Sequence, residues 1–569
     1  MPMTSKMAAA VLVENVSVMV GKGDDHKALL RNISFAVPEG SFLSIIGASG
    51  CGKSTLMRAL VGIQPVSAGR ILLAGHPVET LRQQLPLAIG YLSQFGAFHG
   101  DLTVREILDF AVALRLPSSV PRATRDQWSE HVIDLARIRP FLHQKYGTLS
   151  GGQMRRIALA EGLVGDPAFL FLDELTSGLD AHSEQELMVW LKELAHGLNK
   201  TVVLVSHAVD NLDLCDSVVF LHDGRLCFQG SYKELFRAHE TDSIEAIFGG
   251  YQHASAMGDF VGFDEDRSGE LPPAPEPSVL NTAPPPGSLS QLFTLVRRQN
   301  TLIWRDKAQM WLHLALLLIF PGLVAIFATN GLPQVPTMSL TIEPNVVRSL
   351  AEALGSMKES FSAASLVSGL AMFQVILLTL MGANNGAREI ARERDVLAKE
   401  LRAGLSPWAY VTTKILLVVT LSIAQAFWMT WFVKIICHFP GDLVGQFAIL
   451  FITTLAMSVT CLAISSASKS PERASLLAIY LVGLQLPLSG AVLALPDLVS
   501  TVCRPFIAAY WGWSGYLKTL SSYRDYDVVK QSTGTYIAEF NTCLLILGLH
   551  AVVCGVIAWL FVARSFRRA

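Results

Sequence analysis

Hydrophobic and polar residues follow different patterns in the two halves of this chain of 569 residues. In the first half, short apolar runs at 42–46 and 201–205 alternate with stretches of helical spacing, for example 184–196. Short apolar runs between polar turns indicate buried strands, and their alternation with amphipathic helices is typical of α/β domains. We therefore predict a soluble α/β domain over residues 1–255.

The second half contains long stretches without any charged residue. Six of them lack Asp, Glu, Lys and Arg: 311–329, 361–386, 415–433, 443–468, 476–496 and 540–563. A helix of about 20 apolar residues crosses a hydrocarbon core about 30 Å thick, and each stretch reaches or approaches that length. Any one of them could be a buried core helix, but six in succession favour membrane spans. We predict an all-α domain with six transmembrane helices over residues 309–569.

The segment between these halves has a composition of its own. Residues 262–290 contain seven prolines and few large apolar side chains, which is typical of a flexible or extended linker. Residues 291–307 then place apolar side chains at helical spacing beside four basic residues, Arg297, Arg298, Arg305 and Lys307. A basic amphipathic helix of this kind binds at a membrane surface. We predict a linker over residues 256–290 and an amphipathic connecting helix over residues 291–308.

Composition limits the kinds of partner that the protein can have. Hydrophobic residues make up 51% and charged residues 16% of the chain, and the mean hydropathy is +0.41, which indicates a lipid environment for part of it. The formal net charge of −2 provides no general attraction for nucleic acid. The alternating residues 11–20 predict a strand rather than a signal peptide. We expect a lipid bilayer, and no nucleic acid, among the partners.

Basic residues flank the predicted spans unevenly. If the α/β domain is cytoplasmic, the inward segments carry Arg388, Arg392, Arg394, Lys399 and Arg402, then Lys469 and Arg473, and finally Arg564, Arg567 and Arg568. The outward loops 330–360, 434–442 and 497–539 hold basic residues more sparsely for their length. The positive-inside rule therefore places both termini in the cytoplasm. The short outer loops and the compact length favour a bacterial inner (plasma) membrane.

Residues 47–54 read G-x-x-x-x-G-K-S between a predicted strand and a predicted helix. Glycines in this pattern let successive backbone N–H groups face phosphate oxygens, and the helix N-terminus adds partial positive charge. Lys53 can pair with the β- and γ-phosphates, and the Ser54 hydroxyl can bind Mg²⁺. Because chance produces this pattern in few chains of such length, we predict a site for ATP and Mg²⁺.

Two adjacent acids end a buried-strand pattern further along the chain, where residues 169–174 read F-L-F-L-D-E. A carboxylate at a strand end beside a phosphate-binding loop holds Mg²⁺, which is the role that we predict for Asp173. Glu174 is then placed to orient or deprotonate the attacking water. We therefore predict Glu174 as the general base of ATP hydrolysis.

Two further polar residues follow apolar runs of the α/β domain. Gln94 could reach Mg²⁺ or the attacking water, although a glutamine on a surface turn is the alternative. His207 follows a predicted strand and could sense the γ-phosphate, whereas a lone histidine after a strand is usually just a partly exposed polar residue. We predict a catalytic role for both, and a metal-ligand role for Gln94, because they accompany the other motifs.

Residues 149–153 read L-S-G-G-Q and precede a helical run. A serine and two glycines at a helix start offer backbone N–H groups to phosphate, although an isolated pentapeptide of this kind could be a capped turn. The turn S-G-L-D at 177–180 follows the acid pair.

Together these motifs resemble the nucleotide-binding domain of ABC transporters. L-S-G-G-Q between the phosphate-binding loop and the acidic strand end, with a histidine downstream, is specific to that family among proteins with such a loop. The resemblance implies an α/β P-loop ATPase domain followed by an all-α membrane domain of the ABC-2 type. The nucleotide-binding residues that follow from the motifs and the resemblance are Gly47, Ala48, Ser49, Gly50, Cys51, Gly52, Lys53, Ser54, Thr55, Ser150, Gly151, Gly152, Gln153 and Asp180.

A closer likeness is to the G (White-type) subfamily, whose members are half-transporters with the nucleotide domain first. It is carried by LTVREILDFAVALRLP at 102–117, DELTSGLD at 173–180 and REIARERDVLAKELRAGLSPWAY at 388–410. The last stretch is similar to the cytoplasmic coupling segment of that subfamily. Leu175, where proline is usual, and V-S-H-A-V at 205–209 depart from the family pattern, and no aromatic ring stands near residues 18–20 to stack on adenine.

Cys51 lies inside the glycine loop beside Lys53 and at a helix start. The helix dipole and the nearby ammonium predict a thiol with a lowered pKa, with a buried, inert cysteine as the alternative.

One chain has one phosphate-binding loop and one L-S-G-G-Q, so the resemblance implies a head-to-tail dimer with two shared ATP sites. We expect a homodimer; a heterodimer with another half-transporter is possible. The implied function is ATP-hydrolysis-driven export of a hydrophobic or amphipathic compound, a small molecule or a lipid. The alternative is a non-transporting membrane ATPase that regulates or remodels a partner protein. Phe373, Gln374, Gln485 and Ser489 are candidate substrate contacts, with helix packing as their alternative role.

Overall fold

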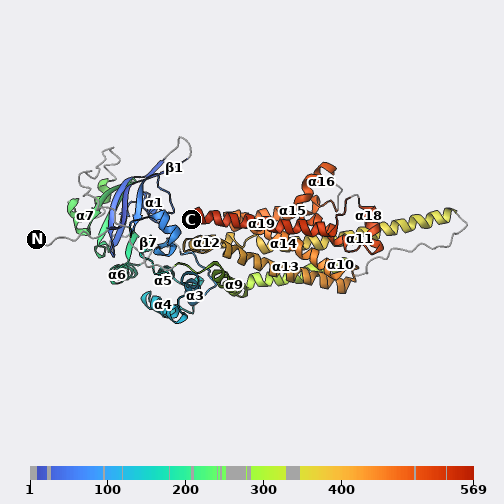
Figure 1. Cartoon of the computed structure of the whole chain (residues 1–569), viewed down its shortest axis with the longest axis horizontal. Coiled ribbons are helices and arrows are strands. Elements are labelled where there is room, and N and C mark those ends of the chain that lie inside the picture. The colour runs from blue at the N-terminus through green and yellow to red at the C-terminus, as the bar shows by residue number, and fades with distance from the viewer. Residues whose placement is uncertain are drawn as a thin grey trace. The chain divides into compact units, whose positions relative to one another are not determined.

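The structure, a computed structural model, describes residues 9–21, 27–93, 96–117, 119–177, 180–206, 211–239, 241, 243, 246–251, 277, 284–328, 346–491, 495–533 and 535–568. It divides into two compact units. Unit 1 comprises Met1–Thr294, Lys399–Leu405 and Arg568–Ala569, and unit 2 comprises Leu295–Ala398 and Ser406–Arg567. In the described chain the strands belong to unit 1 and the long helices to unit 2 (Figure 1). The predicted fold class, an α/β domain followed by a helical one, is thereby confirmed.

Unit 1 contains two β-sheets. The antiparallel sheet has the order β2-β1-β4-β5, from β1 (Ala9–Val20), β2 (Lys27–Pro38), β4 (Ala68–Leu73) and β5 (His76–Pro77). The larger sheet has the order β10-β9-β3-β8-β7-β6, from β3 (Phe42–Gly47), β6 (Ile89–Leu92), β7 (Phe169–Asp173), β8 (Thr201–Val205), β9 (Ser217–His222) and β10 (Arg225–Gly230). Only β10 is antiparallel in the larger sheet. Because parallel strands end at one edge, the loop after β3 and the acids that end β7 come to the same edge.

Helices follow the strands of unit 1 in the sequence. They are α1 (Lys53–Leu60), α2 (Val78–Gln84), α3 (Val104–Arg115), α4 (Arg122–Leu135), α5 (Gly151–Leu163), α6 (Ala181–Gly197) and α7 (Tyr232–Ala238), with short 3₁₀ turns η1 (Pro86–Ala88), η2 (Arg139–Phe141), η3 (Tyr146–Thr148) and η4 (Leu212–Leu214). Every residue of β3, β7 and β8 is buried. Strands covered on both faces must be apolar throughout, which is why they stand out as continuous apolar runs.

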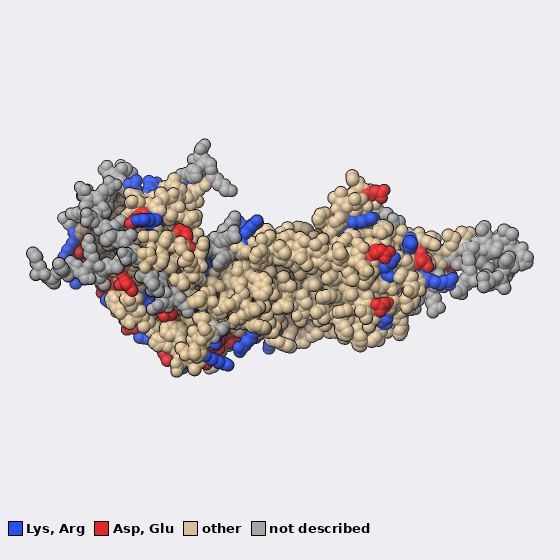
Figure 2. Space-filling model, in the orientation of Figure 1, with Lys and Arg blue, Asp and Glu red and all other residues tan. Residues whose placement is uncertain are grey.

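All regular secondary structure in the described part of unit 2 is helical. Its elements are α9 (Ser288–Arg305, shared with unit 1), α10 (Lys307–Ala328), α11 (Val346–Gly386), η6 (Ala391–Glu393), α12 (Arg394–Arg402, also shared with unit 1), α13 (Pro407–Cys437), α14 (Leu443–Ala467), α15 (Pro471–Leu488), α16 (Asp497–Cys503), η7 (Arg504–Phe506), α17 (Ala508–Lys518), α18 (Arg524–Ser532) and α19 (Phe540–Arg568). Figure 2 shows a broad belt of unit 2 without acidic or basic side chains on the face in view. Such a belt is the surface that a lipid-facing helix bundle needs.

Five of the six predicted spans coincide with helices long and apolar enough to cross a membrane. Within the described residues these helices are α10, α11 with the segment after it, α13, α14 and α19. The sixth prediction, 476–496, is only partly right, because α15 begins at Pro471 with two charged residues and ends at Leu488. Gly490, with a φ of 73°, turns the chain out of the helical conformation soon afterwards. Residues 489–491 and 495–496 of the predicted span are therefore not helical, and 492–494 lie outside the described residues.

The stretch 497–539, predicted as an outward loop, contains three helices, α16, α17 and α18. In α17, Tyr510, Trp513 and Tyr516 are fully buried and belong to the core of unit 2. Their ring polar atoms have partners: Trp513 Nε1 donates to Ser368 Oγ at 3.2 Å, and the Tyr510 hydroxyl donates to the carbonyl of Tyr536 at 2.9 Å. The sequence prediction missed this buried helix because its glycines and polar residues interrupt any long apolar run.

The stretch between the second and third predicted spans is not a single helix. The chain leaves α11 at Gly386, forms the 3₁₀ turn η6, and then forms the short helix α12. The end of α12 and the residues after it, Lys399–Leu405, are part of unit 1.

Candidate functional site

The phosphate-binding loop has the backbone shape that the glycine pattern predicts. It connects β3 to α1, and Gly47, Gly50 and Gly52 all have positive φ, at 150°, 79° and 107°. A Cβ on Gly47 would lie 2.2 Å from the carbonyl oxygen of Leu221, so only glycine fits there. The loop leads directly into the N-terminus of α1, whose first N–H groups have no partner within the helix and can bind an anion.

Lys53 reaches back over the loop that precedes it. Its Nζ donates to the carbonyl oxygens of Gly47 at 2.7 Å and Ala48 at 3.0 Å, and its side chain is buried. These oxygens are neutral acceptors, so phosphate oxygens with full negative charge can replace or join them. The ammonium thus lies over the glycine loop, and its contact with phosphate stays a prediction.

The predicted metal ligands Ser54 and Asp173 meet although 119 residues separate them. The Ser54 hydroxyl donates to Asp173 Oδ1 at 3.4 Å. Burial, and after it the negative charge of Glu174, raise the pKa of the Asp173 carboxyl. A nearby cation would oppose both effects, and a hydroxyl beside a carboxylate is an oxygen donor set of the kind that Mg²⁺ accepts together with phosphates. The residues therefore fit the predicted ion.

Glu174 adopts an uncommon backbone conformation directly after β7. Its φ is 56°, in the left-handed region, and its N–H donates to the carbonyl of Val205 on β8 at 3.1 Å. Non-glycine residues in this region cost free energy and are concentrated at functional sites. Asp173 ends the extended strand β7 whereas Glu174 has a left-handed backbone, so the two neighbouring acids differ in backbone conformation, as groups with different roles can.

The predicted second phosphate-binding motif starts a helix. Ser150 caps α5: its hydroxyl accepts from the N–H of Gln153 at 3.4 Å, and the Gln153 side chain accepts from the N–H of Ser150 at 3.0 Å. Ser150 and Gly151 are exposed. Both alternatives, a capped turn and a phosphate contact, are compatible with this geometry, because an exposed helix start can receive an anion from outside.

Asp180 caps α6 in the same way. It accepts from the N–H of Ser183 at 3.0 Å and from the Ser183 hydroxyl at 2.7 Å. These hydrogen bonds lower the pKa of the Asp180 carboxyl, which stays exposed and charged. Its predicted nucleotide contact stays a prediction.

Two predicted catalytic residues, Gln94 and His207, lie outside the described residues. Their roles stay predictions. The sequence reasoning missed Arg155 on α5, whose Nη2 donates to the carbonyl of Ser177 in the turn after β7. This bond ties the helix of the L-S-G-G-Q motif to the acidic strand end. No spacing rule identifies it, because its partner is a backbone atom.

The predicted reactive thiol of Cys51 is contradicted. Its side chain is 6% exposed and contributes to the core of unit 1. Burial raises the pKa of the Cys51 thiol, and this effect is larger than the opposing effect of the Lys53 ammonium. The buried cysteine of the alternative is what the structure shows, because the loop turns the sulfur inward, close to Gly47.

Three of the predicted substrate contacts point into the core of unit 2. Gln374 accepts from the Tyr516 hydroxyl at 3.4 Å, Gln485 accepts from the N–H of Ala509 at 3.0 Å, and the Ser489 hydroxyl donates to the carbonyl of Leu486 at 2.7 Å. All three are fully buried. Phe373 is partly buried and makes an edge contact with Phe327. Helix packing, the alternative role, accounts for these side chains.

The described residues contain no group of three or more His, Cys, Asp or Glu side chains able to hold a metal ion by themselves. A glycine loop with a buried lysine, next to a hydroxyl–carboxylate pair at a parallel sheet edge, instead defines a P-loop nucleoside triphosphatase. Its chain continues into a bundle of apolar helices, so the class is that of ATP-driven membrane proteins.

Comparison with known proteins agrees with this class. Residues 30–177 match the family "ABC transporter", and residues 290–512 match "ABC-2 type transporter". The ABC transporter ATP-binding/permease protein Rv1747 of Mycobacterium tuberculosis is 27% identical over 94% of this chain and 61% of its own length. A probable sulfate/thiosulfate import ATP-binding protein of Chlorella vulgaris is 33% identical over 42% of this chain and 98% of its own length. A dimeric ATP-binding cassette, MJ0796, with ADP and Pi, is 26% identical over 39% of this chain, with a TM-score of 0.36.

The chain therefore belongs to the ABC transporter family, with an N-terminal ATP-binding domain and a membrane domain of the ABC-2 type. It is an integral membrane protein. It spans about 61% of the length of the mycobacterial relative. Its closer likeness to the G subfamily stays a prediction.

Proposed function

We propose that this protein is an ATP-hydrolysing exporter of a hydrophobic or amphipathic compound and works as a dimer, most simply a homodimer. The observation that carries the proposal is the approach of Ser54 to Asp173 beside Lys53 and Glu174, in a chain that continues into an ABC-2 membrane domain. Export is favoured by the membrane domain, since the ATP-binding domain alone is similar to that of an importer.

The residues of the site divide the work of hydrolysis among them. Lys53 binds the β- and γ-phosphates, and the N–H groups of the glycine loop hold their oxygens. Ser54 and Asp173 would hold Mg²⁺, which neutralises charge on the phosphates when bound. Glu174 orients the attacking water and accepts its proton. Gln94 and His207 are proposed to contact the metal and the γ-phosphate, respectively.

The L-S-G-G-Q motif and Asp180 are proposed to act on ATP held by the partner subunit. The exposed capped start of α5 supports this, since it leaves Ser150 and Gly151 open to an incoming phosphate. Closure of the two ATP-binding domains would then depend on the γ-phosphate, and hydrolysis of ATP would let the two domains separate again.

Contacts of Lys399 within unit 1 support coupling through α12. Its Nζ lies 3.3 Å from Glu161 Oε1 on α5 and 3.5 Å from the centre of the Phe98 ring. Arg402 lies over the ring of Tyr91, at 5.6 Å from its centre. Helix α12 therefore contacts residues that flank the predicted Gln94, and we propose that it transmits closure of the ATP-binding domains to the membrane helices.

We further propose a bacterial inner membrane and cytoplasmic termini. The test is reconstitution of the full chain in lipid nanodiscs and in proteoliposomes, with a panel of lipids, sterols and drugs. We expect at least one compound to stimulate ATPase activity and to move across the proteoliposome membrane only with ATP. The Glu174→Gln variant should support no movement. ATPase activity that responds only to an added partner protein, without movement of any compound, would favour the non-transporting ATPase instead.

A further inference from the structure

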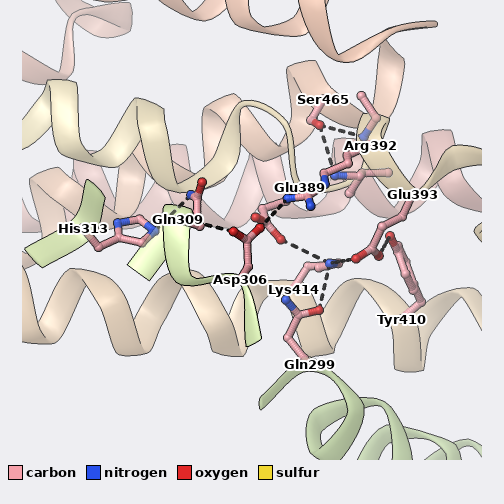
Figure 3. Close-up of polar contacts among 12 residues, drawn as sticks. Gln299, Asp306, Gln309, His313, Glu389, Arg392, Glu393, Tyr410, Lys414 and Ser465 are labelled. Carbon is pink, nitrogen blue, oxygen red and sulfur yellow. Dashed lines mark hydrogen bonds and ion pairs between the residues drawn. The ribbon is translucent and has the colours of Figure 1, made fainter. Parts of the chain in front are cut away.

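A buried lysine of unit 2 connects three segments that lie far apart in the sequence. Lys414, on α13, is 1% exposed. Its Nζ lies 2.9 Å from Gln299 Oε1 on α9, 3.2 Å from Glu389 Oε2 and 3.0 Å from Glu393 Oε1 (Figure 3). An ammonium group has three hydrogen-bond donors, and Lys414 has three acceptors. Its entire hydrogen-bonding capacity is directed at α9 and at the turn before α12.

The two acids lie in the turn that leads from α11 into α12, and α13 and α14 hold the same turn by further bonds. The Tyr410 hydroxyl on α13 donates to Glu393 Oε2 at 3.0 Å. Ser465 Oγ on α14 accepts from the N–H groups of Ile390 at 3.1 Å and Ala391 at 3.0 Å (Figure 3). These N–H groups lie at the start of η6, where they have no partner within that 3₁₀ turn, and they thus find an acceptor on a neighbouring helix.

Basic residues of the turn reach two other places in unit 2. Arg392 Nη1 donates to Asp306 Oδ2, at the junction of α9 and α10, at 3.0 Å. Arg394 Nη1 donates to the carbonyl of Ser468, after α14, at 2.6 Å. The turn is therefore bonded on several sides, and Lys414 is its one buried cationic partner among the contacts described above.

Such bonds restrict motion differently from apolar packing. Apolar burial is non-directional, whereas hydrogen-bonded charges in a buried place allow few arrangements. Buried ionic groups can thereby specify one geometry even where they add little net stability. A second ion pair of unit 2 joins the Lys518 ammonium to the exposed carboxylate of Glu539 at 2.8 Å. Unlike Lys414, Lys518 makes no bond to the turn before α12 among the described contacts.

We propose that Lys414 is a positioning residue for energy coupling: it sets the direction in which α12 leaves the membrane helices. This inference rests on the proposed role of α12 in transmitting closure of the ATP-binding domains. Lys414 belongs to unit 2 and the residues of the proposed ATP site to unit 1, so the inference predicts no change in ATP binding when Lys414 is altered.

The first test measures backbone hydrogen exchange of the full chain in lipid nanodiscs, without nucleotide. In Lys414→Met, peptides covering 389–402 should exchange roughly tenfold faster than in the unaltered protein, because the turn loses its central partner. The matched control Lys518→Met should leave these peptides unchanged. Unchanged exchange of 389–402 in folded Lys414→Met would overturn the proposal.

The second test separates hydrogen bonding from charge balance. In Lys414→Met with Glu389→Gln and Glu393→Gln, no buried charge is left without its partner, so this variant should fold even if the single variant does not. We expect it still to exchange faster over 389–402, because the bonds from Lys414 are gone. Protection equal to that of the unaltered protein would mean that Lys414 merely neutralises the acids.

The functional arm uses the panel compound that stimulates the ATPase of the unaltered protein most. Lys414→Met should keep basal ATPase within about twofold and the same KM for ATP, and lose most of the stimulation. Retained stimulation would contradict the coupling role. If no compound stimulates the unaltered protein, the export proposal fails, while the exchange measurements still decide the role of Lys414.

Discussion

Two buried lysines, one in each unit, show how differently the two parts of this molecule use the same side chain. Lys53 bonds to the neutral carbonyl oxygens of Gly47 and Ala48, which lie within six residues of it. Lys414 bonds to two carboxylates and an amide that lie up to 115 residues away. A phosphate can replace the carbonyl oxygens as the hydrogen-bond acceptors of Lys53. The acceptors of Lys414 are charged or amide side chains of the protein itself, and no ligand is proposed to replace them.

The difference teaches where each kind of chemistry can be recognised. A ligand site built on one loop keeps its residues together in the sequence, because the backbone of that loop forms most of the site. A network built between helices collects residues from any helix that passes nearby, so its spacing carries no pattern. Four changes test this contrast, and we order them by the size of the expected effect.

Glu174→Gln removes the proposed general base while keeping the shape of the side chain. We expect ATP to bind normally and its hydrolysis to slow by about a hundredfold or more, as is usual when a positioned base is lost. Phosphate release and nucleotide binding, measured on the same sample, check this. Hydrolysis near the normal rate would assign the base to another residue.

Lys53→Met tests whether the lysine of unit 1 serves a ligand and not the fold. We expect ATP affinity to fall by roughly tenfold or more, since a charge-assisted contact to phosphate is lost, with the thermal midpoint of the nucleotide-free protein nearly unchanged. Lys414→Met should show the reverse pattern: ATP affinity is kept, and the thermal midpoint of the nucleotide-free protein falls. Equal loss of ATP affinity in both variants would remove the distinction between the two lysines.

The double variant Glu393→Ala with Arg394→Ala removes three contacts of the turn before α12: the pairing with Lys414, the bond from the Tyr410 hydroxyl, and the bond to the carbonyl of Ser468. Basal ATPase should stay within about twofold, and substrate stimulation should be lost. Glu472→Ala with Arg473→Ala, an adjacent and exposed pair of the same composition at the start of α15, is the matched control. Intact stimulation in the first pair would place the mechanical link elsewhere.

Changing Cys51 should have the smallest effect on ATPase activity, and the pKa of its thiol can be tested by the pH dependence of labelling. Burial disfavours the charged thiolate and raises the pKa of the thiol above its ordinary value of 9.0, so the reactive form should accumulate only at more alkaline pH. Maleimide labelling of Cys51, followed by peptide mapping, should therefore be slow at pH 7 and still be rising with pH beyond 9. The Cys51→Ser variant should keep ATPase activity within about twofold. A labelling rate that levels off below pH 8 would indicate the lowered pKa that the sequence alone suggested.

The sequence by itself determined the class of the protein. The strand, glycine loop and helix around Lys53 are adjacent in the chain, and the apolar spans can be recognised because crossing a bilayer constrains each helix separately. Five of the six spans and the meeting of Ser54 with Asp173 were predictable for these reasons. Asp173 joins the loop from a distance only because parallel strands end at one edge of a sheet.

Only the tertiary structure decided which residues distant in the sequence surround a side chain, and therefore its burial, its pairing and its pKa. It buried the thiol of Cys51, so the local helix start and ammonium no longer set its pKa. It turned Gln374 and Gln485 into the helix core, placed the aromatic rings of α17 there, and joined Lys414 to Glu389 and Glu393. Burial and pairing depend on which helices pack together, and that packing is a property of the whole chain and not of any segment.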